Sequence, residues 1–503
     1  MAETDSLQVR RILLEGNTVF SDRQLREAVT GAFEHQRLSA QRLQALRRAL
    51  TRYYVSRGYA NSGALIPEQK VIDGDLRVSI IEGRLTRLDF HGQAGLDEAY
   101  LRHRLSPLLG QPLQTDALYR QLSLLQEHPL IEALDARLDP DLALGQARLS
   151  VGIVERGGWQ WGVGIANDRA SGIGEHRGFV QLVRPSLTGW GDPLTLRLGL
   201  TRGLRDLALR YERELRWRDW SVLAGFERSS STVIEAPFDA LDIEARTENS
   251  TLSLRRHLLR DDSDEIAIDL GLSVRDSRTW LLGERFSFSP GSIDGQARSG
   301  AVELGHDWSH RGLGTALASR VALRVGIEAF GSSTAPAQPD THFVSLGGQA
   351  RYARRLGAGK DQLVLRLAAQ YTANPLLASE QFTIGGVSSV RGYRENRLVR
   401  DRGASASIEW RRPLLEGTLP AGLGAGPAQL QGVLFADVGT GTLVGRQAIG
   451  PRSLASIGAG LRLLAANGLS AEIFYGHGLG DVPSAGNSLQ DRGLHFRLVF
   501  AGG

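Results

Sequence analysis

From Gly158 onwards, the chain consists of short stretches in which apolar and polar residues alternate, separated by turns rich in Gly, Asp, Asn and Ser. Alternation of this kind is typical of β-strands that have one apolar and one polar face. In Leu494–Phe500, for example, one face carries two leucines and two phenylalanines, and the other carries His495 and Arg497. Sixteen strands are expected, beginning near residues 158, 177, 193, 205, 219, 247, 264, 299, 318, 343, 361, 404, 430, 454, 468 and 493.

Two architectures fit this alternation. A soluble sandwich buries its apolar face and exposes its charges to water, whereas a membrane-spanning barrel turns its apolar face to lipid and lines a wet interior with charges. The even number of strands, their length and the aromatic Phe500 near the chain end favour the barrel. Closure also removes the unpaired edges that an open sheet of this size would have to protect.

The composition excludes several classes of function. The 503 residues include no Cys, so disulfides, thiolate metal sites and cysteine nucleophiles are impossible. The 59 basic and 55 acidic residues leave a formal charge of only +4, which gives no electrostatic case for binding nucleic acid. The mean hydropathy is −0.18, and no stretch approaches the roughly 18–20 apolar residues of a membrane helix. The first six residues lack the basic and apolar segments of a signal peptide, which fits either a cytoplasmic protein or a mature exported chain with an added initiator Met, and the barrel interpretation favours the second.

Two small repeats precede the strands. Residues 8–83 are expected to form a strand, two helices and two strands, with Ser21 and Ser39 as helix N-caps, and residues 84–156 repeat this order. Two unrelated α+β domains would be the alternative interpretation. The predicted organisation is a tail at 1–7, small domains at 8–83 and 84–156, a barrel at 157–500 and a tail at 501–503.

The tetrapeptide Val390-Arg391-Gly392-Tyr393 lies in an irregular segment, residues 372–403, between the eleventh and twelfth expected strands. An arginine on a glycine-bearing loop within a strand array indicates a plug or gate rather than a catalytic centre. Gly392 allows a positive φ or a close approach of the backbone. The alternative is that Arg391 is simply solvated on a surface loop.

No enzymatic or metal-binding motif accompanies these features. The sequence contains no phosphate-binding loop, no GxSxG and no HExxH, so we expect neither an enzyme nor a cofactor nor a metal. His306, Asp307 and His310 are interpreted as solvated residues rather than ligands. Tryptophans at the expected strand ends are interpreted as parts of the interfacial aromatic girdles: Trp159, Trp161 and Trp190.

Taken together, these segments resemble the outer-membrane transporters of two-partner secretion (the FhaC and ShlB type), within the superfamily that includes BamA. The resemblance covers essentially the whole chain. In addition to the tetrapeptide, it is carried by Tyr53–Tyr59, Ile66–Gln69, Asp73-Gly74 and Ile81–Arg84 in the first repeat, and by Gly110–Leu113 and Leu138–Pro140 in the second. It implies two periplasmic POTRA domains followed by a transmembrane antiparallel barrel of sixteen strands.

In this family the loop that bears the tetrapeptide folds back into the barrel, and its Arg pairs with acidic residues of the inner wall. Asp437, in Phe435–Gly439, matches the family position of the acidic partner, and Glu409 is a second candidate. If the first strand rises from the periplasm, the connection carrying Arg391 is extracellular, as the family requires. Phe500 matches the aromatic residue read by the barrel assembly machinery, although Ala501-Gly502-Gly503 follow it.

The function implied by the resemblance is export of a large secreted exoprotein across the outer membrane without ATP. The POTRA region, residues 8–156, would bind the N-terminal secretion domain of this partner in the periplasm, although one sequence does not identify the contact residues. Outer-membrane lipids and the barrel assembly machinery are the other expected partners. Two alternatives remain: an assembly factor that inserts other barrels, and a diffusion porin, which would need no periplasmic repeats.

Overall fold

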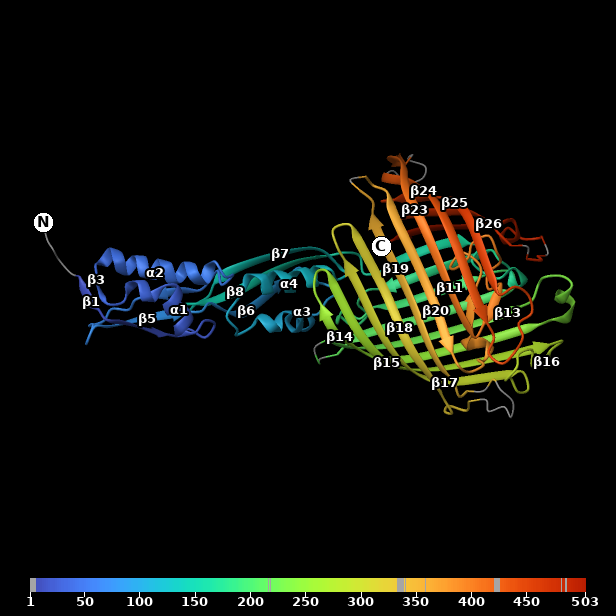
Figure 1. The fold of residues 1–503 in the computed structure, drawn as a ribbon, viewed down its shortest axis with the longest axis horizontal. Coiled ribbons are helices and arrows are strands. Elements are labelled where there is room, and N and C mark those ends of the chain that lie inside the picture. Colours follow the sequence, from blue (N-terminus) through green and yellow to red (C-terminus); the bar gives the residue numbers. More distant parts are fainter. Residues whose placement is uncertain are drawn as a thin grey trace. The chain divides into compact units, whose positions relative to one another are not determined.

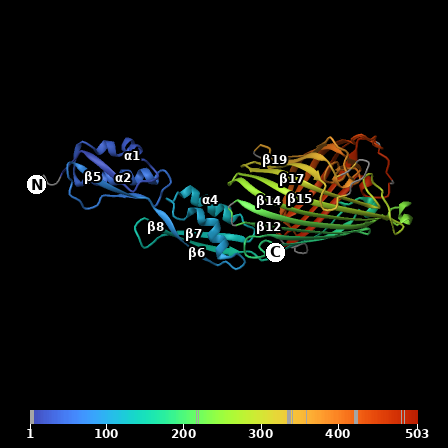
Figure 2. The ribbon, with the colours of Figure 1, turned by 90° about the horizontal axis from the view of Figure 1, so that it is seen from below.

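The computed structural model describes residues 6–215, 217, 219–332, 339, 341–357, 359–419, 426–480, 482–484 and 486–503. The chain divides into two compact units, residues 1–156 and 157–503 (Figures 1 and 2). Over the part of the chain that the structure describes, no helix combines the length and the apolar character needed to cross a membrane.

The first module of the first unit is a helix-covered sheet. Its three-stranded sheet has the order β2-β5-β4, with β2 and β5 parallel. Ser21 begins α1 through a capping box, in which the Ser21 hydroxyl accepts from the Gln24 amide and the Gln24 side chain accepts from the Ser21 amide. The elements are β1 (Leu7–Val9), β2 (Arg11–Glu15), α1 (Asp22–Ala28), β3 (Gln36–Leu38), α2 (Ala40–Val55), β4 (Gly63–Leu65) and β5 (Asp75–Ile81).

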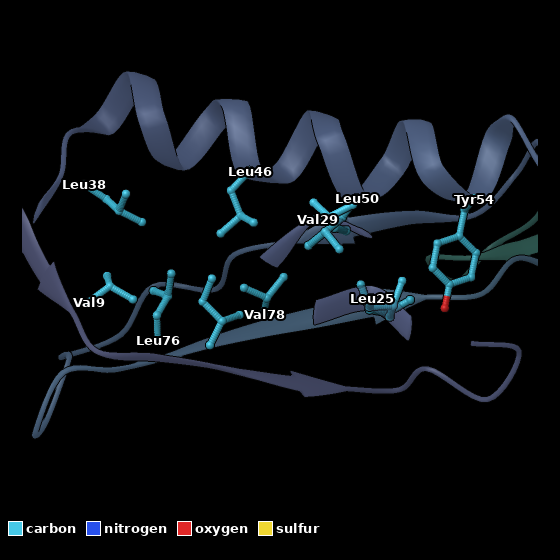
Figure 3. Close-up of a cluster of buried hydrophobic side chains, with 12 residues drawn as sticks. Val9, Leu25, Val29, Leu38, Leu46, Leu50, Tyr54, Leu76 and Val78 are labelled. Carbon is cyan, nitrogen blue, oxygen red and sulfur yellow. The ribbon is translucent and has the colours of Figure 1, made fainter. Parts of the chain in front are cut away.

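The core of this module lies between α2 and the sheet. Figure 3 shows Leu46, Leu50 and Tyr54 pointing from one face of α2 towards the strands. Their spacing of four residues places them on one helix face. They pack with Leu76 and Val78 of β5, and all five side chains are almost completely buried.

The second module repeats the strand, two helices and two strands of the first, as the internal repeat predicts, but it has no counterpart of β1 and β3. Its sheet has the order β6-β8-β7, so β7 is an edge strand with a partner on one side only. The elements are β6 (Arg84–His91), α3 (Glu98–Leu105), α4 (Thr115–Gln126), β7 (Ile131–Pro140) and β8 (Gln146–Glu155).

Glu82 ties the end of the first module to its beginning. Its carboxylate accepts hydrogen bonds from the amides of Thr18 and Val19, both at 2.7 Å, from the Thr18 hydroxyl and from the Tyr54 hydroxyl at 3.0 Å. Burial alone would raise the pKa of this carboxyl, but these hydrogen bonds outweigh burial and hold the pKa below its ordinary value of 4.5. Glu82 therefore contributes stability in its charged form.

The second unit is a closed barrel of sixteen main strands, in which β9 pairs with both β10 and β27. Each observed strand begins within four residues of its expected start, so the prediction of a sixteen-stranded barrel is confirmed. A short strand, β16 (Glu284–Arg285), pairs with the end of β15. The main strands are β9 (Gln160–Ala166), β10 (Arg177–Arg184), β11 (Leu194–Leu200), β12 (Leu204–Glu214), β13 (Trp220–Thr232), β14 (Glu244–Arg260), β15 (Asp264–Leu281), β17 (Gln296–Arg311), β18 (Thr315–Ile327), β19 (Val344–Arg355), β20 (Gln362–Thr372), β23 (Arg402–Leu419), β24 (Gly426–Thr442), β25 (Ser453–Ala465), β26 (Leu469–Gly478) and β27 (Leu494–Gly502).

The alternation along the strands separates the two faces of the barrel wall. On β24, Leu434 and Val438 are about half exposed on the outer face, whereas Phe435 and Asp437 face inwards and are buried. Polar and charged side chains therefore collect in the interior, and apolar ones form the outer surface. This is the arrangement of a membrane barrel rather than of a soluble sandwich.

Replacing Glu82 by Gln should destabilise the first unit, residues 1–156, by about 2 kcal/mol at pH 7, because hydrogen bonds to a charged acceptor are lost. Since the folded-state pKa is depressed, the contribution is complete well above pH 4.5 and disappears as the pH falls through the folded-state value. Chemical unfolding of the unit at pH 7 and at acidic pH should show this difference shrinking on acidification. Glu27→Gln, on an exposed surface pair of the same module, should change little at either pH; an equal effect of both substitutions would contradict the prediction.

Candidate functional site

The segment between β20 and β23 folds into the barrel interior. It contains a short hairpin of β21 (Phe382–Ile384) and β22 (Leu398–Arg400). Ile384, Val390 and Tyr393 form a buried cluster with Leu398 of the loop and with Leu454 of β25. The loop therefore has an apolar side packed on the inner wall, and it connects the eleventh and twelfth main strands, as expected.

Arg391 is almost completely buried in this loop, with only 1% of its surface exposed. Its Nε and one terminal nitrogen donate to the two carboxylate oxygens of Asp437, each at 2.8 Å. The other terminal nitrogen donates to Glu409 at 2.7 Å, and the Arg391 backbone amide donates to Asp437 at 3.1 Å. The structure thus brings together Arg391, Asp437 and Glu409, the three residues that the sequence singled out.

The guanidinium also lies on an aromatic surface. Its central carbon is 3.5 Å from the centre of the Phe435 ring and 5.1 Å from that of Phe474. Phe435 and Asp437 are two residues apart on β24, so the alternation of the strand points both at the same arginine. A planar cation held between a carboxylate and a ring face has a fixed orientation, which a lysine would not reproduce.

Glycine is required after this arginine. Gly392 has φ +90°, and a Cβ at this position would lie 2.7 Å from the carbonyl oxygen of Gly476 on β26. Its amide donates to Nε2 of His495 on β27 at 3.1 Å, so that nitrogen must be unprotonated. The Tyr393 hydroxyl then donates to the carbonyl oxygen of Ala455 at 3.0 Å. Three consecutive residues of the tetrapeptide therefore contact five strands, β23 to β27.

Glu409 is shared among three arginines. Besides Arg391, it accepts from Arg366 of β20 at 2.8 Å and from Nε of Arg411, its neighbour on the inner face of β23, at 2.9 Å. Arg391 and Arg366 also donate to the Ser407 hydroxyl. The anchoring site is therefore rich in positive charge, with only Asp437 devoted to Arg391.

Sequence reasoning missed a second anchor, Glu380. This residue lies near the start of the loop, is 7% exposed, and accepts from Arg324 of β18 at 3.0 Å and from Arg275 of β15 at 3.1 Å. Its other oxygen accepts from the Ser299 hydroxyl of β17. Glu380 thus fastens the loop to a different part of the wall from the one that holds Arg391. Its segment has no strand periodicity and no motif, so no sequence signal points to Glu380.

A third anchor, Arg394, joins the loop to two other connections of the barrel. Its Nε donates to Asp491 at 2.6 Å, in the connection before β27, and its terminal nitrogens donate to Glu235, in the connection after β13, at 2.9 and 3.0 Å. The three anchors together hold the loop at Glu380, Arg391 and Arg394. The sequence did not single out Arg394 either.

The remaining expected site residues occupy ordinary structural positions. Phe500 lies on the outer face of β27, opposite Val163 of β9, with its ring centre 5.6 Å from that of Trp161. The strand continues through Gly502, two residues beyond the expected barrel end, because Ala501 and Gly502 still pair with β9. Asp307 pairs with Arg320 at 2.7 Å and His310 with Asp264 at 3.0 Å, and the described residues contain no cluster suited to a metal.

Comparison with known proteins gives a consistent result. A model of the family described as haemolysin secretion/activation protein ShlB/FhaC/HecB matches residues 145–463, and a model of the ShlB-type POTRA domain matches residues 7–83. The outer membrane transporter CdiB of Dickeya dadantii (strain 3937) is 24% identical over 425 residues, which cover 81% of this chain and 73% of that protein.

Solved structures share the fold. CdiB from Escherichia coli has a TM-score of 0.72 at 20% identity, with 99% of this chain and 91% of that one covered. CdiB from Acinetobacter baumannii has a TM-score of 0.67 at 18% identity, with 100% and 91% covered. BamA from Haemophilus ducreyi lacking POTRA domains 1–3 has a TM-score of 0.58 at 15% identity, with 99% and 100% covered.

Glu380→Ala should loosen the start of the loop, because the substitution leaves Arg275 and Arg324 without their shared carboxylate. Hydrogen exchange in the detergent-purified barrel should rise in residues 376–384 by at least about tenfold, since breaking a partly buried ionic contact costs at least about 1.4 kcal/mol. Exchange near Arg391 should change less, because that anchor is separate. Glu328→Ala, at an exposed acid after β18, is the control and should leave loop exchange unchanged; unchanged exchange in Glu380→Ala would remove Glu380 as an anchor.

Proposed function

The chain belongs to the haemolysin secretion/activation family ShlB/FhaC/HecB, and from this membership we propose how its two units divide the work of export. It is an outer-membrane transporter of two-partner secretion that exports a partner exoprotein, and its POTRA region is periplasmic. We assign capture of the partner to the periplasmic unit. Control of the pore is assigned to the loop inside the barrel.

The observation that carries the proposed gate is the buried contact of Arg391 with Asp437 and Glu409. The loop reaches from Glu380, held by β15 and β18, to Arg391, held by β23 and β24, so in this docked state it spans part of the lumen. An exported chain needs this space. The ionic contacts can be exchanged for water in a polar lumen more easily than an apolar core can be unpacked, which suits a segment that must move.

Capture of the partner is assigned to the edge strand β7 and the groove beside it. The groove has a volume of about 400 Å³ and lies between α4 and β7. Leu134, Ala136 and Leu138 are alternate residues of β7 that line it, and Tyr119 of α4 is 66% exposed at its side. A strand added to β7 would gain backbone hydrogen bonds along the edge and would place alternate apolar side chains in the groove.

Two further partners follow from the surface of the barrel. Outer-membrane lipids are proposed to cover the outer face, where the apolar side chains of the strands are exposed. The last strand, with Phe500, is proposed as the signal for the barrel assembly machinery during insertion. Export itself is proposed to proceed without ATP, since the polar lumen keeps the backbone of an extended chain hydrated.

Deleting the gene should remove one large protein from the cell surface or the culture medium, because a dedicated transporter serves a dedicated partner. The measurement is a comparison of surface and medium proteins with and without the gene. A broad loss of many outer-membrane barrels would instead identify an assembly factor, the alternative favoured by the fold shared with BamA. No change in either set would contradict both functions.

Arg391→Ala and Asp437→Ala should each abolish secretion while the barrel remains inserted. Either change leaves an uncompensated buried charge or removes the contact that positions the loop, at a cost of about 3–5 kcal/mol if the site stays dry. Secretion of the partner is measured beside heat-modifiable mobility of the membrane-extracted barrel. Arg397→Ala, in the same loop but bonded through an exposed contact to the Pro483 carbonyl, should secrete normally. Wild-type secretion by Arg391→Ala would refute the proposed gate.

Ala136→Arg should weaken capture of the partner, because the exposed Ala136 side chain lines the groove and an arginine there would fill it. Asp135→Arg, at the neighbouring residue on the other face of β7, adds the same side chain outside the groove and serves as the control. Binding of the partner's N-terminal domain to the purified periplasmic unit should fall at least about tenfold in the first variant only. Equal binding by both variants would rule out the groove of β7 as the capture site.

A further inference from the structure

We propose that the barrel lumen contains an oxyanion-binding site between the loop and strands β18 to β20, with Arg351 and Arg366 as its cationic groups. The ligand is a carboxylate, sulfate or phosphate group, supplied either by a free anion or by an acidic side chain of a chain in the pore. The site is separate from the Arg391–Asp437 contact, although both lie on the side of the loop that faces strand β20.

The site is a cavity of about 410 Å³ on the inner wall. Strand β19 contributes Arg351 to its lining and β20 contributes Arg366, while the loop contributes Ser388 and Ser389 and β23 contributes Ser405 and Ser407. Guanidinium groups and hydroxyls are hydrogen-bond donors, and guanidinium groups match the planar geometry of oxyanions. The cavity is large enough for such an anion together with water.

The two arginines lack sufficient negative charge in the protein itself. Arg351 and Arg366 are direct partners in the antiparallel register of β19 and β20, where like charges destabilise a sheet. Arg351 is exposed to the cavity and forms no ion pair or hydrogen bond through its side chain with any residue that the structure describes. Arg351, Arg366, Arg391 and Arg411 are offset only by Glu409 and Asp437, which leaves two positive charges unbalanced.

Arg366 also has an unused donor. One of its terminal nitrogens donates to Glu409 and Ser407, but its Nε is buried and finds no hydrogen-bond partner among the described residues. A buried donor without an acceptor is unfavourable. A bound oxyanion would supply the negative charge that Arg351 and Arg366 lack in the protein itself.

The neighbouring cavity provides an internal comparison. This cavity has a volume of about 610 Å³ and is also lined by arginines. Three of these arginines form ion pairs with three carboxylates of the wall: Arg255, Arg320 and Arg324 with Asp269, Glu303 and Asp307. With Arg197, Arg210 and Glu227, five arginines and four carboxylates line this cavity, so its excess of positive charge is smaller than that of the proposed site. Asp307 also borders the proposed site, where its charge is offset by Arg255 and Arg320.

Occupancy of the site would affect the loop. Ser388 and Ser389 immediately precede Val390 and Arg391, and Ser388 is exposed towards the cavity. An oxyanion held by Arg351 and Arg366 that also accepts from a loop serine would add a contact between the loop and β19–β20. Binding and loop mobility should therefore change together.

The experiment is a titration of the detergent-purified full chain with sodium sulfate, at constant ionic strength maintained with chloride. Hydrogen exchange of residues 385–390 should slow in a saturable manner as sulfate is added. Arg351→Gln should weaken the apparent affinity by about tenfold, because one charge-assisted contact is lost. Arg354→Gln removes an exposed arginine three residues along the same strand, on the opposite face of β19, and should match the wild type.

A hexaglutamate peptide distinguishes the two sources of the anion. Saturable protection by both sulfate and the peptide, or by either alone, that needs about tenfold more ligand in Arg351→Gln supports the site and shows whether free or peptide-borne oxyanions occupy it. Arg351→Lys retains the charge and should bind within a few-fold of wild type if the variants are folded. Absence of saturable protection in the wild type, or equal protection in Arg351→Gln, would overturn the proposal. Because no step of the titration depends on secretion, either result leaves the export function to its own test.

Discussion

Closure of β9 onto β27 is the constraint on which the other features depend. It pairs the backbone of every main strand on both sides, and it creates an interior separated from the outer apolar surface. Polar side chains that would be ordinary on an open sheet are thereby concentrated in one enclosed volume. The loop, its anchors and the unbalanced arginines all exist because the inner face of the wall is charged and shielded from lipid.

Within this interior, ionic contacts determine where the loop lies. Burying Arg391 removes its hydration, and the loss is offset only because Asp437 meets it with two hydrogen bonds while Glu409 and the Phe435 ring complete its surroundings. Such a contact contributes less to the stability of the fold than to placing the loop at one position, since few other positions of the loop would give the guanidinium these hydrogen-bond partners. The apolar contacts of Ile384, Val390 and Tyr393 add affinity, but their shape requirements are looser.

The sequence predicted the strands and the Arg391 contact for different reasons. The strand starts could be predicted because the alternation with a period of two residues is a local pattern. Asp437 and Glu409 were reached through the resemblance, combined with the inward parity of their strands. Glu380 and Arg394 were not found, because each lies in irregular chain and meets partners that only barrel closure brings near. Arg275 and Glu380, for instance, are 105 residues apart in sequence.

The distribution of charge around the lumen bears on how the loop could be released. On the β15–β18 side, where Glu380 docks, acids and arginines are evenly matched, so withdrawing Glu380 would expose a positive wall. On the β19–β23 side, arginines already exceed acids, so an acidic segment entering there would compete with Asp437 and Glu409 for the same guanidinium groups. Both effects favour an approaching negative charge over a positive one. A loop held by such contacts can be displaced by exchange of ionic partners, with the barrel wall and its backbone pairing left intact.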